Sequence, residues 1–230
     1  MISYEAFVEN YQRVRERMAS ACQSCGRAEE SVKLLPVTKT HPFDAAEFAY
    51  RAGLAAAGEN RVQEAAQKKP LAPANLRWEL IGHLQSNKVK QAVETFDRIQ
   101  TVDSLELAKR IDRLAGESGR LMPVLIQANA GADPAKFGLA DFSALRELAE
   151  ETVQLPNLRL EGLMTIPALD ENPEVARKAF DTLREWRDRL AEEMGRPLPE
   201  LSMGMSGDLE IAIAAGSTLV RVGSALFGAR

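Results

Sequence analysis

The chain alternates short apolar runs with longer segments in which apolar residues recur every three or four positions. Short runs rich in Val, Leu and Ile are typical of strands buried on both faces of a parallel sheet. Eight such runs are present, at residues 32–37, 54–57, 78–81, 98–102, 123–128, 158–164, 200–203 and 219–222. We therefore predict eight short strands.

Segments with helical spacing lie between these strands, and one more precedes them. In the first segment, Phe7, Tyr11, Val14 and Met18 fall on one stripe of a helix that begins at Tyr4 and ends near residue 21. Further helices are expected at residues 42–53, 60–69, 86–94, 105–117, 142–152, 173–194 and 207–214. Each strand except the last is thus followed by a helix.

Strands that alternate with helices indicate parallel pairing through right-handed crossovers. Eight units within about 200 residues predict an α/β fold, a single (β/α)8 TIM barrel with an extra N-terminal helix. A doubly wound open sheet is the alternative, since connectivity alone does not show closure. No linker or low-complexity tract interrupts the chain, so residues 1–230 are interpreted as one domain.

Composition excludes several classes of protein. The 230 residues are 45% hydrophobic and 27% charged, with a formal net charge of −4, which argues against a nucleic-acid partner. No apolar run approaches the roughly 18 residues of a membrane span. The charged N-terminal segment does not resemble a signal peptide. We expect a cytoplasmic protein without membrane association.

The two cysteines form a lone CxxC at Cys22 and Cys25, expected in a loop before the first strand. A zinc site would need two more ligands, and the only histidines, His41 and His83, are distant in sequence. We predict two reduced thiols and no metal site.

Candidate chemistry concentrates where strands end, which is the working rim of a barrel. Lys39 directly follows the first strand, so its amine is expected to be partly desolvated and able to form a Schiff base with a carbonyl. The simpler interpretation is a solvated loop lysine paired with a carboxylate. Position alone does not decide between these interpretations.

Two glycine-rich loops follow the last two strands. Gly204, Ser206 and Gly207 come after the seventh strand, and Gly223 and Ser224 after the eighth. Loops at these places commonly bind phosphate in a barrel. Alternatively, Ser206 only caps a helix and the glycines only form turns. Together with a rim lysine, the loops indicate a phosphorylated carbonyl compound, either pyridoxal phosphate or a sugar phosphate.

Arg221 lies within the apolar eighth strand, where an inward-facing guanidinium needs a partner. The pyridine nitrogen of pyridoxal phosphate is one candidate. A structural ion pair with Glu59 or Glu161 is the alternative.

Six motifs resemble the family of pyridoxal phosphate homeostasis proteins. They are VTKT at 37–40, GENRVQE at 58–64, IGHLQSNK at 81–88, EGLMTI at 161–166, SMGMSGD at 202–208 and GSTLVRVGSALFG at 216–228. The resemblance runs from about residue 4 to the C-terminus. It departs at His83, where proline is more common, and at Ser224, which replaces threonine but keeps the hydroxyl.

The resemblance implies a barrel like the N-terminal domain of alanine racemase, with pyridoxal phosphate as cofactor. It implies the aldimine on Lys39, Asn60 near the ring and Arg221 at the pyridine nitrogen. It also implies phosphate contacts from Ser206, Gly223 and Ser224.

Cofactor binding without catalysis is the function we expect. Racemisation needs a base on each face of the aldimine, whereas Lys39 supplies one, and the chain is too short for the second domain that would bring another. A cationic Arg221 also weakens the ring as an electron sink. The predicted protein is a monomeric carrier serving vitamin B6 homeostasis, with apo pyridoxal phosphate enzymes as candidate partners and no catalytic residue.

Two other functions stay open. One is a one-base pyridoxal phosphate enzyme that acts on amino acids as a slow racemase or lyase. The other is a lysine aldolase that acts on a phosphorylated sugar without a cofactor. Lys136, after the fifth strand, is interpreted as a solvated loop lysine, with a role in cofactor exchange as the alternative.

Overall fold

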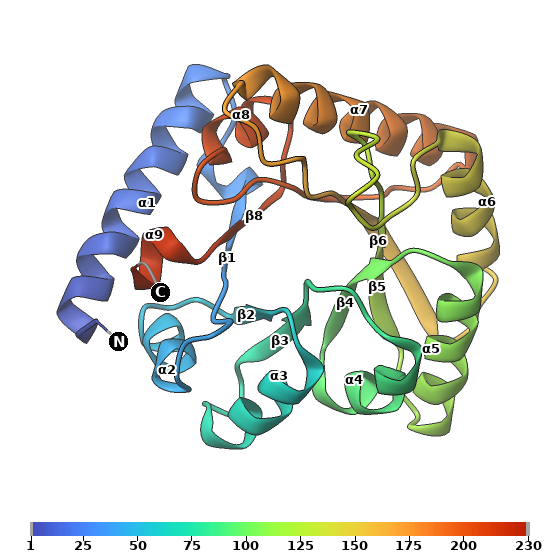
Figure 1. Cartoon of the computed structure of the whole chain (residues 1–230), viewed down its shortest axis with the longest axis horizontal. Coiled ribbons are helices and arrows are strands. Elements are labelled where there is room, and N and C mark those ends of the chain that lie inside the picture. Colours follow the sequence, from blue (N-terminus) through green and yellow to red (C-terminus); the bar gives the residue numbers. More distant parts are fainter. Residues whose placement is uncertain (1, 229–230) are drawn as a thin grey trace.

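A computed structural model of the chain describes residues 2–228 and shows eight parallel strands in one sheet (Figure 1). Their order is β1-β8-β7-β6-β5-β4-β3-β2, so strands that are neighbours in sequence are neighbours in the sheet, except β1 and β2, which lie at the two ends of the order, and β1 pairs with β8. The strands are β1 Lys33–Pro36, β2 Ala56–Glu59, β3 Arg77–Leu80, β4 Arg98–Val102, β5 Met122–Gln127, β6 Leu158–Met164, β7 Glu200–Ser202 and β8 Leu219–Val222.

Strands β1 and β2 lie at the two ends of the sheet order, and the chain just after β1 connects them. Val37 forms a parallel bridge with Gly58, and the amide of Thr38 donates a hydrogen bond to the Gly58 carbonyl at 3.0 Å. This bridge joins the two ends of the sheet order, so the predicted barrel is confirmed and the open-sheet alternative is wrong.

Helices surround the strands on the outside of the barrel (Figure 1). They are α1 Tyr4–Ser24, α2 Asp44–Arg51, α3 Val62–Lys68, α4 Val89–Thr95, α5 Leu105–Glu117, α6 Phe142–Thr152, α7 Pro173–Glu193, α8 Leu209–Ala214 and α9 Ser224–Phe227. Three short 3₁₀ turns lie at Glu29–Ser31, Lys69–Leu71 and Ser86–Lys88. Among the described residues, no helix is long and apolar enough to cross a bilayer.

The extra N-terminal helix, α1, begins after Ser3, whose hydroxyl accepts a hydrogen bond from the amide of Ala6 at 3.2 Å. Its predicted apolar stripe packs inward, and the ring of Phe7 stacks on that of Phe227 from α9, with centroids 5.3 Å apart. The helix α1 therefore lies along the last two helices and covers that side of the barrel (Figure 1).

The CxxC pair does not lie in a loop as predicted, because α1 continues to Ser24 and includes Cys22. Cys22 is buried, Cys25 caps the helix, and both are free cysteines. Burial raises the pKa of the Cys22 thiol, which lowers its thiolate fraction at neutral pH.

Several other element bounds differ from the prediction. Strand β2 begins at Ala56, two residues later than predicted, and includes Gly58 and Glu59, which the sequence pattern places in the following loop. A short helix, α9, follows the last strand although none was predicted there. Helix α8 begins at Leu209, so Ser206 belongs to a turn before it and does not cap it.

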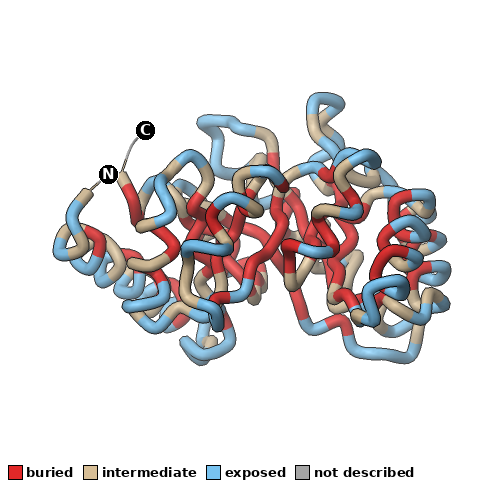
Figure 2. The backbone as a smooth tube through the Cα atoms, turned by 90° about the horizontal axis from the view of Figure 1, so that it is seen from below, coloured by how far each residue is buried: buried red, intermediate tan, exposed pale blue. Residues whose placement is uncertain are grey.

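Buried residues lie mainly in the middle of the molecule and exposed residues on its outer loops and helices (Figure 2). A small cluster of Leu35, Val37, Ile81 and Leu219 is separate from the larger clusters between strands and helices. Such close packing gives the strand ends fixed positions on which rim side chains can be oriented.

Candidate functional site

A cavity of about 340 Å³ lies at the carboxyl ends of the strands. It is lined by Val37, Lys39, Asn60, Ile81, Ile166, Met205, Ser206, Gly207, Arg221, Gly223 and Ser224. The six residues that the resemblance implies for the cofactor therefore all line one cavity. They are Lys39, Asn60, Ser206, Arg221, Gly223 and Ser224. They come from the ends of β1 and β2, the loop before α8, and the end of β8.

Lys39 is positioned by a buried network behind the end of β1. Thr38 is fully buried, and its hydroxyl donates a hydrogen bond to Glu59 Oε1 at 2.6 Å. Lys68 from α3 donates to the Thr38 carbonyl at 2.8 Å and pairs with Glu59 and Glu64, both at 2.7 Å. These contacts fix the backbone on the N-terminal side of Lys39.

The backbone on the other side of Lys39 makes a tight turn. Thr40 has a φ of 65°, a conformation that L-residues other than glycine rarely adopt. Its amide donates to Glu64 Oε1 at 2.5 Å, the same oxygen that Lys68 contacts. Lys39 is thus held between two residues that share one ionic network.

Glu59 is the buried centre of this network. Burial raises the pKa of its carboxyl, while hydrogen bonds from Lys68 and Thr38 act in the opposite direction. Its second oxygen, Oε2, is buried without a hydrogen-bond donor among the described residues. The Glu59 charge consequently depends on Lys68 for its compensation.

Three backbone amides are available to an anion at the opposite wall. Within residues 2–228, the amides of Gly207, Gly223 and Ser224 donate to no protein acceptor. The Ser206 hydroxyl accepts a hydrogen bond from the Ala225 amide at 3.3 Å, which draws the two loops together. Free amides and hydroxyls from two converging loops suit a phosphate group.

The absence of a side chain at Gly223 permits this convergence. A Cβ at Gly223 would lie 3.2 Å from the carbonyl oxygen of Val37, which is tighter than ordinary packing. At Gly207 a Cβ would meet nothing within 4 Å. The two glycines therefore differ: the first allows close backbone packing of β8 on β1, and the second leaves open space.

The loop that carries Ser206 is tied to the N-terminal helix. Arg17 of α1 donates to the Ser206 carbonyl at 3.0 Å and forms an ion pair with Glu210 at 2.6 Å. The Arg17 guanidinium lowers the pKa of the Glu210 carboxyl. The N-terminal helix thus supports one wall of the cavity.

Arg221 is buried and directs its guanidinium across the barrel interior. It donates to the Ser202 hydroxyl at 2.7 Å and to the Thr165 carbonyl at 2.8 Å. Burial lowers the pKa of Arg221 to about 10, and the nearby Asp208 carboxylate acts in the opposite direction. This pKa keeps the guanidinium cationic at neutral pH.

The alternative ion pair of Arg221 with Glu59 or Glu161 is wrong. Glu59 pairs with Lys68, and Glu161 pairs with Arg98 and Arg159. Instead, Arg221 contacts the Ser202 hydroxyl, which in turn donates a hydrogen bond to Gln100 Oε1 at 2.6 Å.

Two rim residues lie outside the cavity lining. The ring of His83 stacks on Phe137, with centroids 4.0 Å apart, and its Nδ1 lies 3.5 Å from Asp103. Lys136 sits next to Phe137 in the loop between β5 and α6 and does not line the cavity.

Sequence reasoning does not single out several residues that hold the site in place, namely Lys68, Arg17 and Gln100. Glu64 and Ser202 stand in the motifs at 58–64 and 202–208, without a role of their own. Lys68 carried one weak signal, because it lies four residues after Glu64 on a helix and can pair with it.

Comparisons with known proteins agree with this geometry. Residues 2–230 match the family described as alanine racemase, N-terminal domain. A pyridoxal phosphate homeostasis protein from Aquifex aeolicus is 44% identical over 223 residues, covering 96% of this chain and 97% of that protein. The Escherichia coli protein of the same name is 41% identical over 227 residues, covering 96% and 95%.

Solved structures show the same fold. PipY of Synechococcus elongatus, in a structure described as having pyridoxal phosphate bound, superposes with a TM-score of 0.80 at 39% identity, covering 94% of this chain and all of that one. Alanine racemase of Clostridium difficile gives a TM-score of 0.81 at 17% identity, and the match spans 98% of this chain and 57% of the racemase. At that identity the racemase shows the fold alone.

The barrel and its rim define a protein of the alanine racemase N-terminal-domain class. Within that class, the chain belongs to the family of pyridoxal phosphate homeostasis proteins, as the sequence motifs had indicated.

Proposed function

We propose that this protein holds pyridoxal 5'-phosphate covalently on Lys39 and serves cofactor homeostasis and delivery without catalysing a reaction. The observation that carries the proposal is the meeting of a lysine amine, free backbone amides and a buried cation in one cavity of about 340 Å³. The PipY structure with pyridoxal phosphate bound supports it at 39% identity.

Seven of the eleven lining residues have a part in this proposal. The amides of Gly207, Gly223 and Ser224, with the Ser206 hydroxyl, would hold the phosphate, and Lys39 would hold the reactive carbon. Asn60, which lines the cavity, would lie near the ring, and Arg221 would face the pyridine nitrogen. When bound, the cofactor supplies an aldehyde with which a lysine amine reacts reversibly.

The side chains around the cavity support binding more than catalysis. Among the described residues that line it, Lys39 and Arg221 are the only titratable ones. Proton exchange at both faces of a bound amino acid needs two groups that accept and return a proton, and a guanidinium is a poor one. A cationic Arg221 also disfavours protonation of the ring nitrogen, which limits the withdrawal of electrons into the ring.

The remaining parts of the proposal concern the setting of the protein. We propose that residues 1–230 act as one cofactor-binding domain, that the protein is a cytoplasmic monomer, and that apo pyridoxal phosphate enzymes receive the cofactor. Nucleic acid and membranes are not partners in this proposal, in keeping with the net charge of −4.

A transfer assay tests the delivery function. The loaded protein is mixed with an apo-enzyme that needs pyridoxal phosphate, and recovery of activity is followed against an equal amount of free cofactor. We expect full recovery, with cofactor passing to the apo-enzyme even when a phosphatase destroys free pyridoxal phosphate. If the phosphatase abolishes recovery, direct delivery is contradicted.

A second assay separates a carrier from an enzyme. Loaded protein is incubated with amino acids in deuterated water, and loss of the Cα proton is followed by NMR. The proposal predicts no exchange above that of free cofactor. Exchange that disappears in Lys39→Ala would establish a one-base enzyme instead, and trapping of a sugar phosphate by cofactor-free protein would establish an aldolase.

A further inference from the structure

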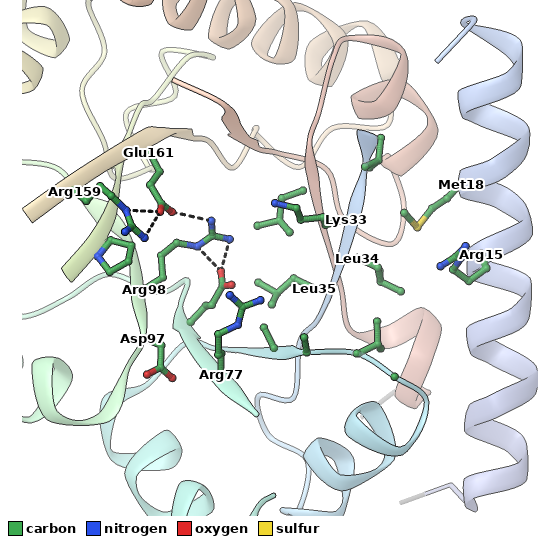
Figure 3. A pocket seen from close by; sticks show the side chains of 18 residues that line it. Arg15, Met18, Lys33, Leu34, Leu35, Arg77, Asp97, Arg98, Arg159 and Glu161 are labelled. Atoms are coloured by element: carbon green, nitrogen blue, oxygen red, sulfur yellow. Dashed lines mark hydrogen bonds and ion pairs between the residues drawn. The ribbon is translucent and has the colours of Figure 1, made fainter. Parts of the chain in front are cut away.

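A second cavity, of about 370 Å³, lies at the opposite end of the barrel from the rim site. Its lining includes residues at or near the amino ends of the strands, such as Lys33 of β1, Arg77 of β3, Arg98 of β4 and Arg159 of β6 (Figure 3). We call this space the basal cavity. Neither the sequence motifs nor the proposed function assigns it a role.

The floor of the basal cavity is an ionic cluster around Arg98. This guanidinium lies 2.7 Å from Glu79, 3.2 Å from Glu161 and 3.2 Å from Glu200. Glu79 and Glu200 are buried, the Glu161 side chain is 19% exposed, and Figure 3 shows the contact of Arg98 with Glu161. Because these carboxylates are already engaged, the floor has little capacity to attract a further cation.

The mouth of the cavity is cationic. Lys33 is bonded to Glu200 at 2.9 Å and Arg159 to Glu161 at 2.8 Å, yet both side chains are more than half exposed. Among the described residues, no carboxylate lies within 4.0 Å of the Arg77 guanidinium, which points into the cavity beside the floor cluster (Figure 3). Arg77 is consequently a cation with free hydrogen-bond donors.

The charge of the lining is opposite to that of the chain. Five cationic side chains and three carboxylates line the cavity, and Glu200, which pairs with Arg98 and Lys33, adds a fourth carboxylate, so the cations exceed the carboxylates by one in a protein whose formal net charge is −4. The cations are Arg15, Lys33, Arg77, Arg98 and Arg159, and the carboxylates are Glu79, Asp97 and Glu161. A local positive excess in an acidic protein attracts anions to this opening in particular.

One wall of the cavity is apolar. Met18 of α1, Leu34 and Leu35 of β1, Leu54 and Leu219 contribute it. A cavity of this size, with an apolar wall and a few convergent polar groups, has the usual form of a small-molecule site.

We propose that the basal cavity binds a small organic anion, with its carboxylate or phosphate head on Arg77 and Lys33 and its apolar body against Leu34, Leu54 and Leu219. A guanidinium presents paired donors that match either head group. The proposal is independent of the function proposed for the rim site.

The test uses benzoate as the probe and follows backbone and methyl NMR signals of the cofactor-loaded full chain. Benzoate should shift the signals of Leu34, Leu54 and Leu219 in a saturable way. Benzylamine, which carries the same ring with the opposite charge, should leave them unchanged. Inorganic phosphate tests the contribution of the apolar body. Phosphate should shift these signals less than benzoate does, and a shift by phosphate without a shift by benzoate would contradict the proposal.

A matched pair of variants locates the site. Arg77→Gln removes the unpaired guanidinium at an exposed position and should weaken benzoate binding about tenfold, as expected when a charged hydrogen bond is lost. Arg110→Gln, an exposed arginine on α5 away from the cavity, should bind benzoate as the unmodified protein does.

Three results would overturn the proposal. The first is that neither benzoate nor phosphate produces saturable shifts at these leucines, and the second is that benzylamine shifts them as much as benzoate does. The third is that Arg77→Gln and Arg110→Gln bind benzoate with equal affinity. Shifts confined to Gly207, Gly223 and Ser224 would mean that the anion binds at the rim, and they would also overturn it. None of these results bears on whether the rim site holds a cofactor.

Discussion

The guanidinium of Arg221 donates a hydrogen bond to the hydroxyl of Ser202 at 2.7 Å inside the barrel, where both residues are buried. Ser202 donates in turn to Gln100, and Gln100 donates to Glu79 at 2.6 Å. This chain of hydrogen bonds orients Arg221 through a neutral hydroxyl and gives it no carboxylate partner. Among the described residues Arg221 therefore has no direct ion pair, and the nearby Asp208 carboxylate is the acidic group that acts on its charge at the rim cavity.

Ser202→Ala should change the cofactor site through Arg221. The substitution leaves a buried N–H of a charged group without its acceptor, which should lower the free energy of unfolding by about 1.5–3 kcal/mol. The reoriented guanidinium should also shift the absorption maximum of the loaded protein and weaken cofactor binding. Absorption spectra and equilibrium dialysis with pyridoxal phosphate provide the measurements.

Ser217→Ala is the matched control for this substitution. Ser217 is fully buried and donates to the Met203 carbonyl at 2.7 Å, without contact to Arg221. It should lose stability yet keep the unmodified spectrum. Identical spectra for both variants and the unmodified protein would show that Ser202 does not orient Arg221.

Lys68→Met should destabilise the fold strongly. It leaves the buried Glu59 carboxylate without its cation, a change that costs about 3–5 kcal/mol in buried ion pairs. Urea unfolding measures this loss. Lys69→Met is the neighbouring control, and since Lys69 is only partly buried it should cost about 1 kcal/mol or less.

The pH dependence of Lys68→Met follows from Glu59. A carboxyl whose folded-state pKa is raised contributes stability below its unfolded pKa and loses it as the pH rises through the folded pKa. The destabilisation should therefore be largest near neutral pH and shrink as the pH falls toward the ordinary glutamate value. A deficit that stays constant over this range would mean that Glu59 is not the group left unpaired.

Arg17→Met should also lose its deficit in acid, but from a carboxyl whose pKa is lowered in the folded protein and with a smaller amplitude. The Glu210 carboxyl has a lowered pKa in the folded protein, so its pairing stabilises above the unfolded pKa and is lost as the pH falls through the folded value. Because both groups are more than a third exposed, the loss at neutral pH should be about 0.3–1 kcal/mol. Most of this difference should vanish on acidification below about pH 4, as thermal unfolding at several pH values would show.

An unfolding difference that grows in acid would contradict this assignment. Arg15→Met is the control, because its ion pair with Glu29 is long, at 3.9 Å, and exposed on both sides. It should change stability little at any pH.

The sequence predicted those parts of the molecule that depend on local pattern. The bounds of β4, β6, β8, α5 and α6 agree with prediction, because each has regular apolar spacing and, for both helices, an N-cap serine or aspartate. Lys39 and the two glycine loops could be found because they directly follow strands.

Long-range contacts account for what the sequence did not predict. Ser202 and Gln100 are separated by 102 positions and meet only because β4 and β7 both face the barrel interior. The end of β2 was missed because Gly58 and Glu59 have no strand-like character of their own. Gly58 packs against Leu35, and Glu59 is neutralised by Lys68 from the next helix.

The most direct test of the account is reduction of the pyridoxal phosphate-loaded protein with borohydride, followed by peptide mass spectrometry. Reduction fixes the cofactor on whichever amine holds it. We predict a pyridoxyl group on the peptide that contains Lys39, its loss in Lys39→Ala, and its retention in Lys136→Ala. A label on another lysine of the unmodified protein, with none on Lys39, would contradict the account.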